Sequence, residues 1–303
     1  MNKKKTGASS GRKLTKGELV FTGVNRLILA IAGIVTLAPF VYVFFISLLS
    51  EAEYKARGLV IPQSPTLENY WMFLNWGTKI RDAYVATLFI TVVGTFVALF
   101  VTAMLAYGLS KSELPGHRVF NGLLVFTMFF SGGMIPTYLV IKSLGLLNTY
   151  WAIILPMSLS VWNTMVMRTF FREIPVALEE SARLDGASDF TIAFRIVFPL
   201  SKASFATIGL FYAVAYWNEW YSALLYLNDS KMYPLQMALR DIISQNAQAL
   251  DVSKMAGKGI QNNPPSQIVK MTAIMVSTLP ILCVYPFLQK HFTKGIVMGS
   301  VKG

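Results

Sequence analysis

The sequence predicts an all-α protein of the polytopic membrane class, with six transmembrane helices. Three observations support this fold class. The chain has 303 residues, of which 54% are hydrophobic and only 14% are charged, a balance that soluble domains of this size rarely show. Its apolar residues form six segments of about 20 residues, the length that a helix needs to cross the hydrocarbon core. Its basic residues are more frequent in alternate connections between these segments.

The six apolar segments are separated by polar connections. They lie at about residues 28–49, 86–109, 119–141, 150–167, 203–227 and 269–288. The first three contain no charged residue, so burial inside a soluble core does not explain them. Gly132, Gly133 and Pro136 interrupt the third segment, and Pro156 interrupts the fourth. We therefore expect kinked or broken helices at these two places.

The N-terminal tail, residues 1–23, is basic and precedes the first segment. A signal peptide is the alternative, but the apolar segment is longer than a typical signal region and no small-residue cleavage site follows it. The positive-inside rule then orients the six-helix domain, residues 24–303. With the N-terminus inside, 17 of the 27 Lys and Arg residues lie on the cytoplasmic side. Both termini and residues 175–200 are therefore expected in the cytoplasm.

Composition and motifs disfavour several other classes. The net charge of +12 is spread over the loops, which favours contact with anionic membrane lipid and disfavours nucleic-acid binding. The single cysteine, Cys283, lies within the last segment, so a disulfide framework is excluded. His117 and His291 are far apart, and no metalloprotease or serine-hydrolase motif is present. We expect no catalytic residue, no metal site and no cofactor on this chain.

A charged, helix-prone stretch at residues 175–199 separates two apolar segments. Pro175 can begin a helix there, with Glu179 and Glu180 in its first turn, where carboxylates favour the positive end of the helix dipole. Arg183 lies on the same face of this helix as the two glutamates. We expect acidic groups to be displayed outside the lipid, with a plain cytoplasmic loop as the alternative.

The same stretch carries signals for a turn and a second helix. Gly186 can adopt the left-handed conformation that ends a helix. Ser188 can cap a second helix before Pro199. The predicted element is therefore a short helix–turn–helix between two membrane spans.

This stretch resembles the EAA loop of ABC importer membrane subunits. The resemblance is carried by Glu180, Ser181, Ala182, Arg183, Leu184, Asp185, Gly186 and Ala187, followed by Ile196 and Pro199. Ser181 replaces the first alanine of the family pattern, and Ala203 stands where a second proline is common. The resemblance implies the type I ABC importer permease fold, with a cytoplasmic coupling helix that docks into an ATPase. The residues that it implies in this contact are Glu179, Glu180, Ala182, Arg183, Asp185, Gly186, Ala187 and Pro199.

Further segments are similar to the carbohydrate-uptake branch of this family, the maltose-type permeases. They are residues 133–138, 144–149, 217–218, 233–235, 285–290 and 294–303. The similarity, over about residues 24–303, implies the shorter second permease of an oligosaccharide importer. Such a subunit forms half of the translocation pore and pairs with a homologous second permease in the bacterial inner membrane. Two ATPase subunits, which hold ATP and Mg²⁺, and a solute-binding protein complete the importer.

Two other functions remain open. An ATPase-independent secondary sugar carrier would use the same six spans, but no Lys or His lies deep in another span to form a proton relay with Glu219. An ABC permease for a non-sugar solute, such as glycerol phosphate, would share the coupling loop.

The fifth apolar segment contains a polar and aromatic group that is a candidate pore lining. Its members are Tyr212, Trp217, Asn218 and Glu219. A carboxylate at membrane depth faces a cavity or a partner rather than lipid, and aromatic faces suit sugar rings. A position at the outer membrane interface, where Trp and Tyr are ordinary, is the alternative.

The outer loop, residues 228–267, and the C-terminal tail are further candidate contacts. Pro234 can begin an amphipathic helix with Leu235 and Leu239 on one face. In the resembling permeases this loop reaches the binding protein, so docking is expected, with lipid contact as the alternative. Lys302 and Gly303 are expected to enter the ATPase interface, with a frayed tail as the alternative.

Overall fold

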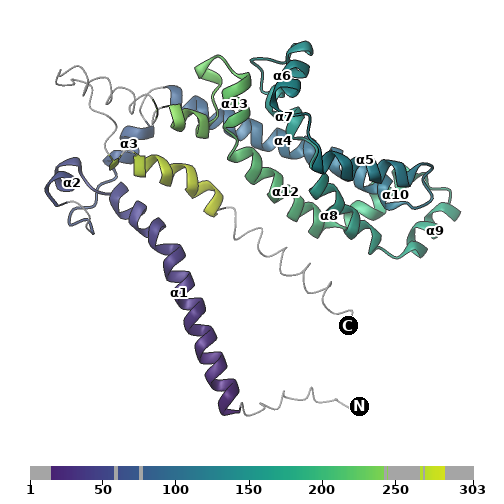
Figure 1. Ribbon diagram of the computed structural model, residues 1–303, viewed down its shortest axis with the longest axis horizontal. Helices are drawn as coiled ribbons and strands as arrows, with labels where there is room; N and C mark the ends of the chain where they lie inside the picture. The colour runs from purple at the N-terminus through teal and green to yellow at the C-terminus, as the bar shows by residue number, and fades with distance from the viewer. Residues whose placement is uncertain are drawn as a thin grey trace, which may run out of the picture.

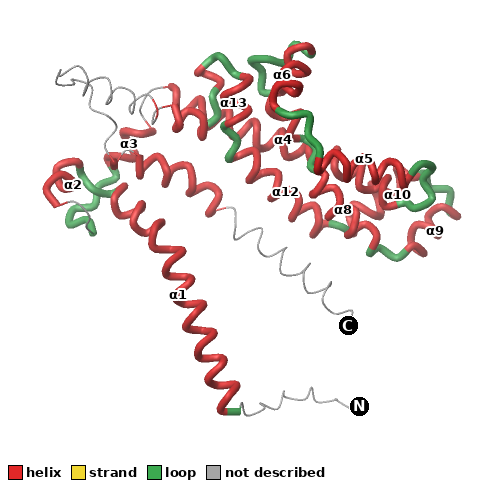
Figure 2. The backbone as a smooth tube through the Cα atoms, in the orientation of Figure 1, coloured by secondary structure: helices red, strands yellow, loops and turns green. Residues whose placement is uncertain are grey.

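The computed structural model describes residues 15–57, 61–74, 78–241, 244, 267–268 and 270–283. All of the regular secondary structure in these ranges is helical, which confirms the all-α fold class (Figure 2). Most of the outer loop lies outside the described residues, and so do Lys302 and Gly303 with their expected contacts.

The helices follow one another through short connections. In chain order they are α1 (Lys16–Ser47), α2 (Glu51–Arg57), α3 (Glu68–Leu74), α4 (Thr78–Ser110), α5 (His117–Phe129), α6 (Met134–Ser143), α7 (Trp151–Met157), α8 (Val161–Arg172), α9 (Val176–Leu184), α10 (Asp189–Ile192), the π-helix η1 (Ala193–Val197), α11 (Phe198–Leu200), α12 (Lys202–Trp217), α13 (Tyr221–Tyr226) and the 3₁₀ helix η2 (Ser230–Met232). Residues 235–241 and Lys270–Cys283 are also helical.

Two of the expected segments contain an unbroken helix that is long and apolar enough to cross a membrane. They are α1 and the part of α4 from Ile80 to Ser110. Two further helix pairs reach this length only together: α5 with α6, bent by 114°, and Asp189–Leu200 with α12, bent by 83°. By length and composition the described residues therefore hold two to four spans.

The breaks expected from Gly and Pro are present in the third and fourth segments. Gly133 lies between α5 and α6 with φ of +85°, a conformation that glycine adopts without steric cost. Pro156 lies at the end of α7, and α8 begins afresh at Val161, where the Ser160 hydroxyl accepts a hydrogen bond from the Asn163 N–H. Each of these segments is therefore two helices rather than one.

Helix α1 extends away from the other helices, and its most apolar stretch is not buried at all by the rest of the chain (Figure 1). It begins at Lys16, ahead of the apolar segment, so residues 16–23 of the basic tail are helical. The reason is a capping box, in which Thr15 and Glu18 each accept a hydrogen bond from the other's backbone N–H. The apolar face of α1 is left for lipid or another subunit.

The core lies where α4 packs against α8 and α12, which run side by side in Figure 1. Tyr216 of α12 is 1% exposed and donates a hydrogen bond to the Ile154 carbonyl at 2.9 Å. The face of its ring lies over Gly94 of α4, where a Cβ atom would be only 2.8 Å from the ring. The close approach of α4 and α12 therefore depends on a residue without a side chain.

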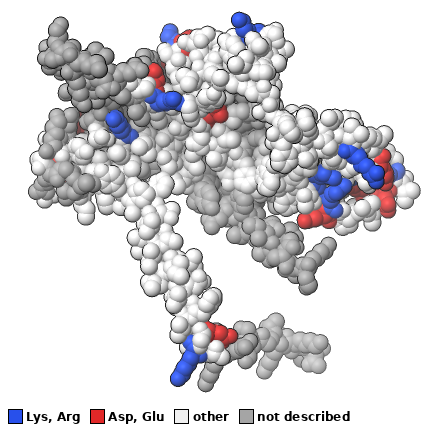
Figure 3. Space-filling model, viewed as in Figure 1, with Lys and Arg blue, Asp and Glu red and all other residues white. Residues whose placement is uncertain are grey.

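Charged side chains gather in separate groups on the face shown in Figure 3. A mixed group of acidic and basic residues covers the end that carries α9, and most other charges lie over α6 and α13, at the upper left of the view, or at the start of α1. The surface between is almost free of charge. This separation matches an apolar belt in lipid, with α9 outside it.

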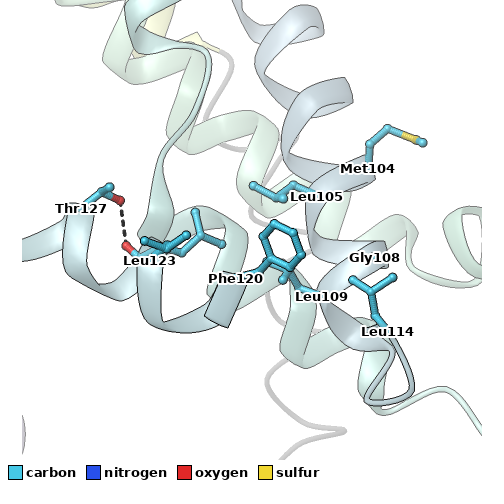
Figure 4. Close-up of a pocket in the computed structure, with 9 residues that line it drawn as sticks. Met104, Leu105, Gly108, Leu109, Leu114, Phe120, Leu123 and Thr127 are labelled. Atoms are coloured by element: carbon cyan, nitrogen blue, oxygen red, sulfur yellow. Dashed lines mark hydrogen bonds between the residues drawn. The ribbon is translucent and has the colours of Figure 1, made fainter. Parts of the chain in front are cut away.

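An apolar hollow of about 360 Å³ lies between α4 and α5 (Figure 4). It is lined by Met104, Leu105, Gly108, Leu109, Leu114, Phe120, Leu123, Leu124 and Thr127. The hydroxyl of Thr127 donates to the Leu124 carbonyl of its own helix at 2.8 Å. The hollow therefore offers no free hydroxyl donor to a sugar.

Candidate coupling elbow and pore residues

Helix α9 ends in a turn whose backbone conformation favours glycine, at Gly186. The φ angle of Gly186 is +83°, as the sequence predicts. The Ala187 N–H donates to the Ala182 carbonyl at 2.9 Å, and the Gly186 N–H donates to the Arg183 carbonyl at 3.0 Å. These two bonds form a Schellman motif, which satisfies carbonyls that the helix end leaves unpaired.

The second helix of the predicted pair begins directly after this turn. The Ser188 hydroxyl accepts a hydrogen bond from the Thr191 N–H and so caps α10. The local prediction of a helix–turn–helix is therefore confirmed. We call α9, the turn at Gly186 and α10 the α9–α10 elbow.

The structure corrects the expectation that Glu179 is displayed. Glu179 is 7% exposed, and its carboxylate forms an ion pair with Lys111, at the end of α4. The Lys111 Nζ also lies 4.7 Å from the centre of the Tyr107 ring, which favours its positive charge. Helical spacing places Glu179 on a face of α9 but does not show which neighbour covers it.

Arg183 pairs with neither Glu179 nor Glu180. It donates a hydrogen bond to the Asp189 carboxylate at 3.2 Å, across the turn, and lies 3.9 Å from the Glu113 carboxylate. The hydrogen bond to Asp189 raises the pKa of the Arg183 guanidinium above its ordinary value. Arg183 therefore stays charged at any physiological pH and ties α9 to α10.

The tip of the elbow is both acidic and apolar. Glu180 and Asp185 are exposed, as the sequence predicts. Leu184 and Phe190 are also exposed, at 90% and 67% of their surfaces. Sequence reasoning missed these two apolar residues, although large hydrophobic side chains within a charged loop are an available signal for a docking surface.

Pro199 lies at the return to the membrane spans. It is exposed in α11, beside Phe194 and Lys202. Phe198 stacks at 5.7 Å on Phe171 of α8, which anchors this end of the segment to the core.

Two of the four candidate pore residues are buried within the chain. Tyr212 accepts a hydrogen bond from the Ser160 N–H at 2.9 Å, and its hydroxyl lies 2.7 Å from that of Thr102. Trp217 donates to the Ser277 carbonyl at 3.1 Å. The expectation that these side chains face a pathway is wrong for this conformation, because polar partners elsewhere in the fold hold them inside.

The other two candidates are accessible. Asn218 is exposed, and its amide donates to the Val214 carbonyl at 2.8 Å. Glu219 is half-buried and accepts a hydrogen bond from the Ser222 N–H, in the first turn of α13, at 2.6 Å. Both stand at the break between α12 and α13.

The candidate docking residues also turn inward. Pro234, Leu235 and Leu239 are buried, and the Leu235 N–H donates to the Thr87 hydroxyl at 2.7 Å. The amphipathic helix is present at residues 235–241, but its apolar face packs against Trp217 and other core residues instead of a partner. The helix exposes Arg240, whose guanidinium lies 3.7 Å from the centre of the Trp220 ring.

The described residues contain no group of three or more His, Cys, Asp or Glu side chains that could hold a metal ion. The tip of the elbow presents the exposed side chains of Glu180, Leu184, Asp185 and Phe190.

Comparison with known proteins agrees with this description. A family model described as the binding-protein-dependent transport system inner membrane component matches residues 7–298. Protein LplC of Bacillus subtilis is 48% identical over 291 residues, which cover 95% of this chain and 97% of that relative. The polygalacturonan/rhamnogalacturonan transport system permease protein YtcP of the same organism is 46% identical over 274 residues, covering 89% and 94%.

A solved structure shares the fold. It is the crystal structure of a bacterial ABC transporter involved in the import of the acidic polysaccharide alginate, and one chain of it aligns with a TM-score of 0.81 at 31% identity. The alignment covers 93% of this chain and 99% of that chain. Family membership implies ATPase and binding-protein partners. The chain belongs to the binding-protein-dependent transport system inner membrane components, and it is a multi-pass, non-catalytic permease subunit of an ABC importer.

Proposed function

We propose that this chain is one of two different permease subunits of an importer for acidic oligosaccharides. The observation that carries the proposal is the α9–α10 elbow, whose tip exposes acidic and apolar residues at a charged end of the molecule. Such a tip suits a cleft on a cytoplasmic ATPase. The acidic cargo is inferred from the relatives, since one carries polygalacturonan in its name and another imports alginate.

The proposed mechanism is alternating access. A binding protein delivers the sugar to the outer side, and two ATPase subunits hold ATP and Mg²⁺ on the inner side. Closure of the ATPase dimer displaces Glu180, Asp185 and the rest of the elbow, and the spans rock as rigid bodies. The chain crosses the membrane six times in this proposal, with both termini in the cytoplasm. In this proposal Lys302 and Gly303 contact the ATPase, and the outer loop, residues 228–267, contacts the binding protein.

Uptake should require the ATPase and the binding protein together. We expect vesicles that contain this chain, its partner permease, the ATPase and the binding protein to accumulate oligosaccharide only when ATP is supplied on the ATPase side. Omission of either partner protein should reduce accumulation to that of empty vesicles. Accumulation without the ATPase would instead identify a secondary carrier.

Arg240 is the exposed group best suited to an acidic cargo. Its guanidinium rests on Trp220, so its in-plane N–H donors remain free to bind a carboxylate in a bidentate manner. Asn218 and Glu219 immediately precede Trp220 and supply neighbouring polar groups. We propose that this outer-side group contacts the cargo during its entry.

Arg240→Gln should lower the uptake of short galacturonate oligomers by about tenfold at low substrate concentration, since a charge-assisted hydrogen bond contributes about 1.5 kcal/mol or more. The measurement is the initial rate of uptake of labelled oligomers into vesicles. Lys231→Gln is the matched control, because Lys231 is an exposed cation outside this group. Equal rates in the two variants would contradict the role of Arg240. Uptake of neutral but not of acidic oligomers by the wild type would contradict the acidic cargo itself.

A further inference from the structure

Among the buried residues that the structure describes, Glu179 is the only one with a charged side chain. Most of the residues around it in α9 are exposed. A buried carboxylate requires a partner, and Lys111 supplies it from a position 68 residues earlier in the chain. The most deeply buried charge of the described chain therefore lies at the joint between α4 and the elbow.

The ion pair of Lys111 and Glu179 lies where α4 and α8 end and α9 begins. Lys111 directly follows the last residue of α4, and Glu179 lies in the first turn of α9. The Lys111 ammonium lies against both the Glu179 carboxylate and the Tyr107 ring. Arg172, at the end of α8, donates to the Ser110 carbonyl at 3.5 Å on the same side. The ends of α4, α8 and α9 thus meet at one ion pair.

The other polar link between these parts is weaker. Arg183 lies 3.9 Å from the Glu113 carboxylate, whose side chain is 87% exposed. Exposed ion pairs of this kind contribute little, because water and salt screen them. The link from Arg183 to Asp189 is internal to the elbow and does not reach α4. Ala182, Ala187 and Ile192 of the elbow also pack against the core cluster that contains Ala106 and Tyr107 of α4. Among the polar links between α9 and α4 that the structure describes, the pair of Lys111 and Glu179 is therefore the strongest.

We propose that Lys111 and Glu179 are positioning residues that lock the elbow to α4, so that a displacement of α9 by the ATPase becomes a displacement of α4. Helix α4 packs against α7, α8 and α12, so its movement carries the core of the subunit with it. This inference rests on the proposed role of the elbow as the ATPase contact. The family resemblance names Glu179 only as a contact with the ATPase and does not name Lys111, whereas this inference assigns the transmission step to the pair.

The chemistry of the pair suits a positional role. Removal of one partner leaves the other charge buried without compensation, whereas exchange of the two residues restores opposite charges in the same joint. An apolar pair of similar volume can stabilise a fold as well as an ion pair does, but it does not fix the relative direction of two helix ends through a hydrogen bond. The variants that separate these effects are therefore single substitutions, the exchange, and an apolar pair.

The experiment uses the complete importer in vesicles, with Lys111→Met, Glu179→Gln, the exchange Lys111→Glu with Glu179→Lys, and the apolar pair Lys111→Met with Glu179→Leu. Three quantities are measured for each: the amount of ATPase that copurifies, the rate of ATP hydrolysis, and the uptake of sugar per ATP hydrolysed. Glu113→Gln is the control, because it alters the neighbouring exposed pair at the same joint.

We expect both single variants to retain the ATPase and its hydrolysis while uptake per ATP falls by about tenfold, within the range that coupling between sites typically spans. The exchange should recover a large part of the uptake per ATP, and the apolar pair should assemble without recovering it. Glu113→Gln should resemble the wild type.

Three results would overturn the proposal. Unchanged uptake per ATP in both single variants would show that the pair does not transmit movement. A loss of uptake that follows a loss of copurified ATPase would show a purely structural role. Full uptake per ATP in the apolar pair would show that packing alone is sufficient. A separate pair of substitutions, at the tip residues Leu184 and Asp185, tests the proposed contact between the elbow and the ATPase. If the ATPase stays bound and fully coupled to uptake in these variants, that contact is wrong, whatever the Lys111 and Glu179 variants show.

Discussion

Gly186→Val is expected to abolish ATP-driven uptake while the subunit still inserts into the membrane. The φ angle of Gly186 is +83°, and this left-handed conformation is unfavourable for a β-branched residue by about 1 to 3 kcal/mol. The strain falls on the turn that orients α9 against α10. A Cβ atom at this position would meet no other atom within 4 Å, so we attribute the effect to backbone conformation.

The measurement is uptake by vesicles with the complete importer, together with the amount of subunit in the membrane. Gly186→Asn should keep much of the uptake, because asparagine tolerates the left-handed region better than other residues do. Gly145→Val is the matched control: Gly145 has φ of +68° and equally open surroundings, but it lies between α6 and α7, far along the chain from the elbow. Normal uptake by Gly186→Val would show that this turn is not part of the coupling element.

Gly94→Ala is expected to destabilise the subunit, although alanine normally stabilises a helix relative to glycine. The added Cβ atom would lie 2.8 Å from the Tyr216 ring, closer than two such atoms approach in proteins. Tyr216 cannot move away easily, because it is 1% exposed and its hydroxyl is bonded to the Ile154 carbonyl. Overpacking of this kind costs about 1 to 3 kcal/mol, more than the gain of about 0.5 to 1 kcal/mol in helix propensity.

The measurement is the apparent midpoint of thermal unfolding of the detergent-solubilised complex. Gly108→Ala is the control in the same helix, since a Cβ atom at Gly108 meets nothing within 4 Å. We expect the midpoint to fall for Gly94→Ala and to stay or rise for Gly108→Ala. A higher midpoint of thermal unfolding in both variants would contradict the close packing of α4 on α12 at Gly94.

Local features of the elbow were predictable because their causes are local. A left-handed glycine after a helix, a serine cap and a proline at the helix start each act on residues within one turn, so the residue order is sufficient to place them. The helix breaks near Gly133 and Pro156 follow from the same kind of constraint. The resemblance of residues 180–199 to the EAA loop predicts that this element contacts an ATPase.

The partners of individual side chains were not predictable in this way. Glu179 and Glu180 are adjacent in the sequence, yet one is buried against Lys111 and the other is exposed. The sequence predicts Trp217 in a pore lining and Leu235 on a docking face, but both side chains pack into the core of the chain. Amphipathic spacing identifies an apolar face without identifying what covers it.

The sequence by itself determined that this chain is a helical membrane protein with a charged elbow, because hydropathy, charge distribution and local turn chemistry depend on residue type and order alone. The resemblance of the elbow to the EAA loop added that the chain is a permease. Only the tertiary structure decided which charged and aromatic residues are buried and which remain available. The physical reason is that burial is set by contacts between segments far apart in the chain, as in the pairing of Lys111 with Glu179 and of Gly94 with Tyr216.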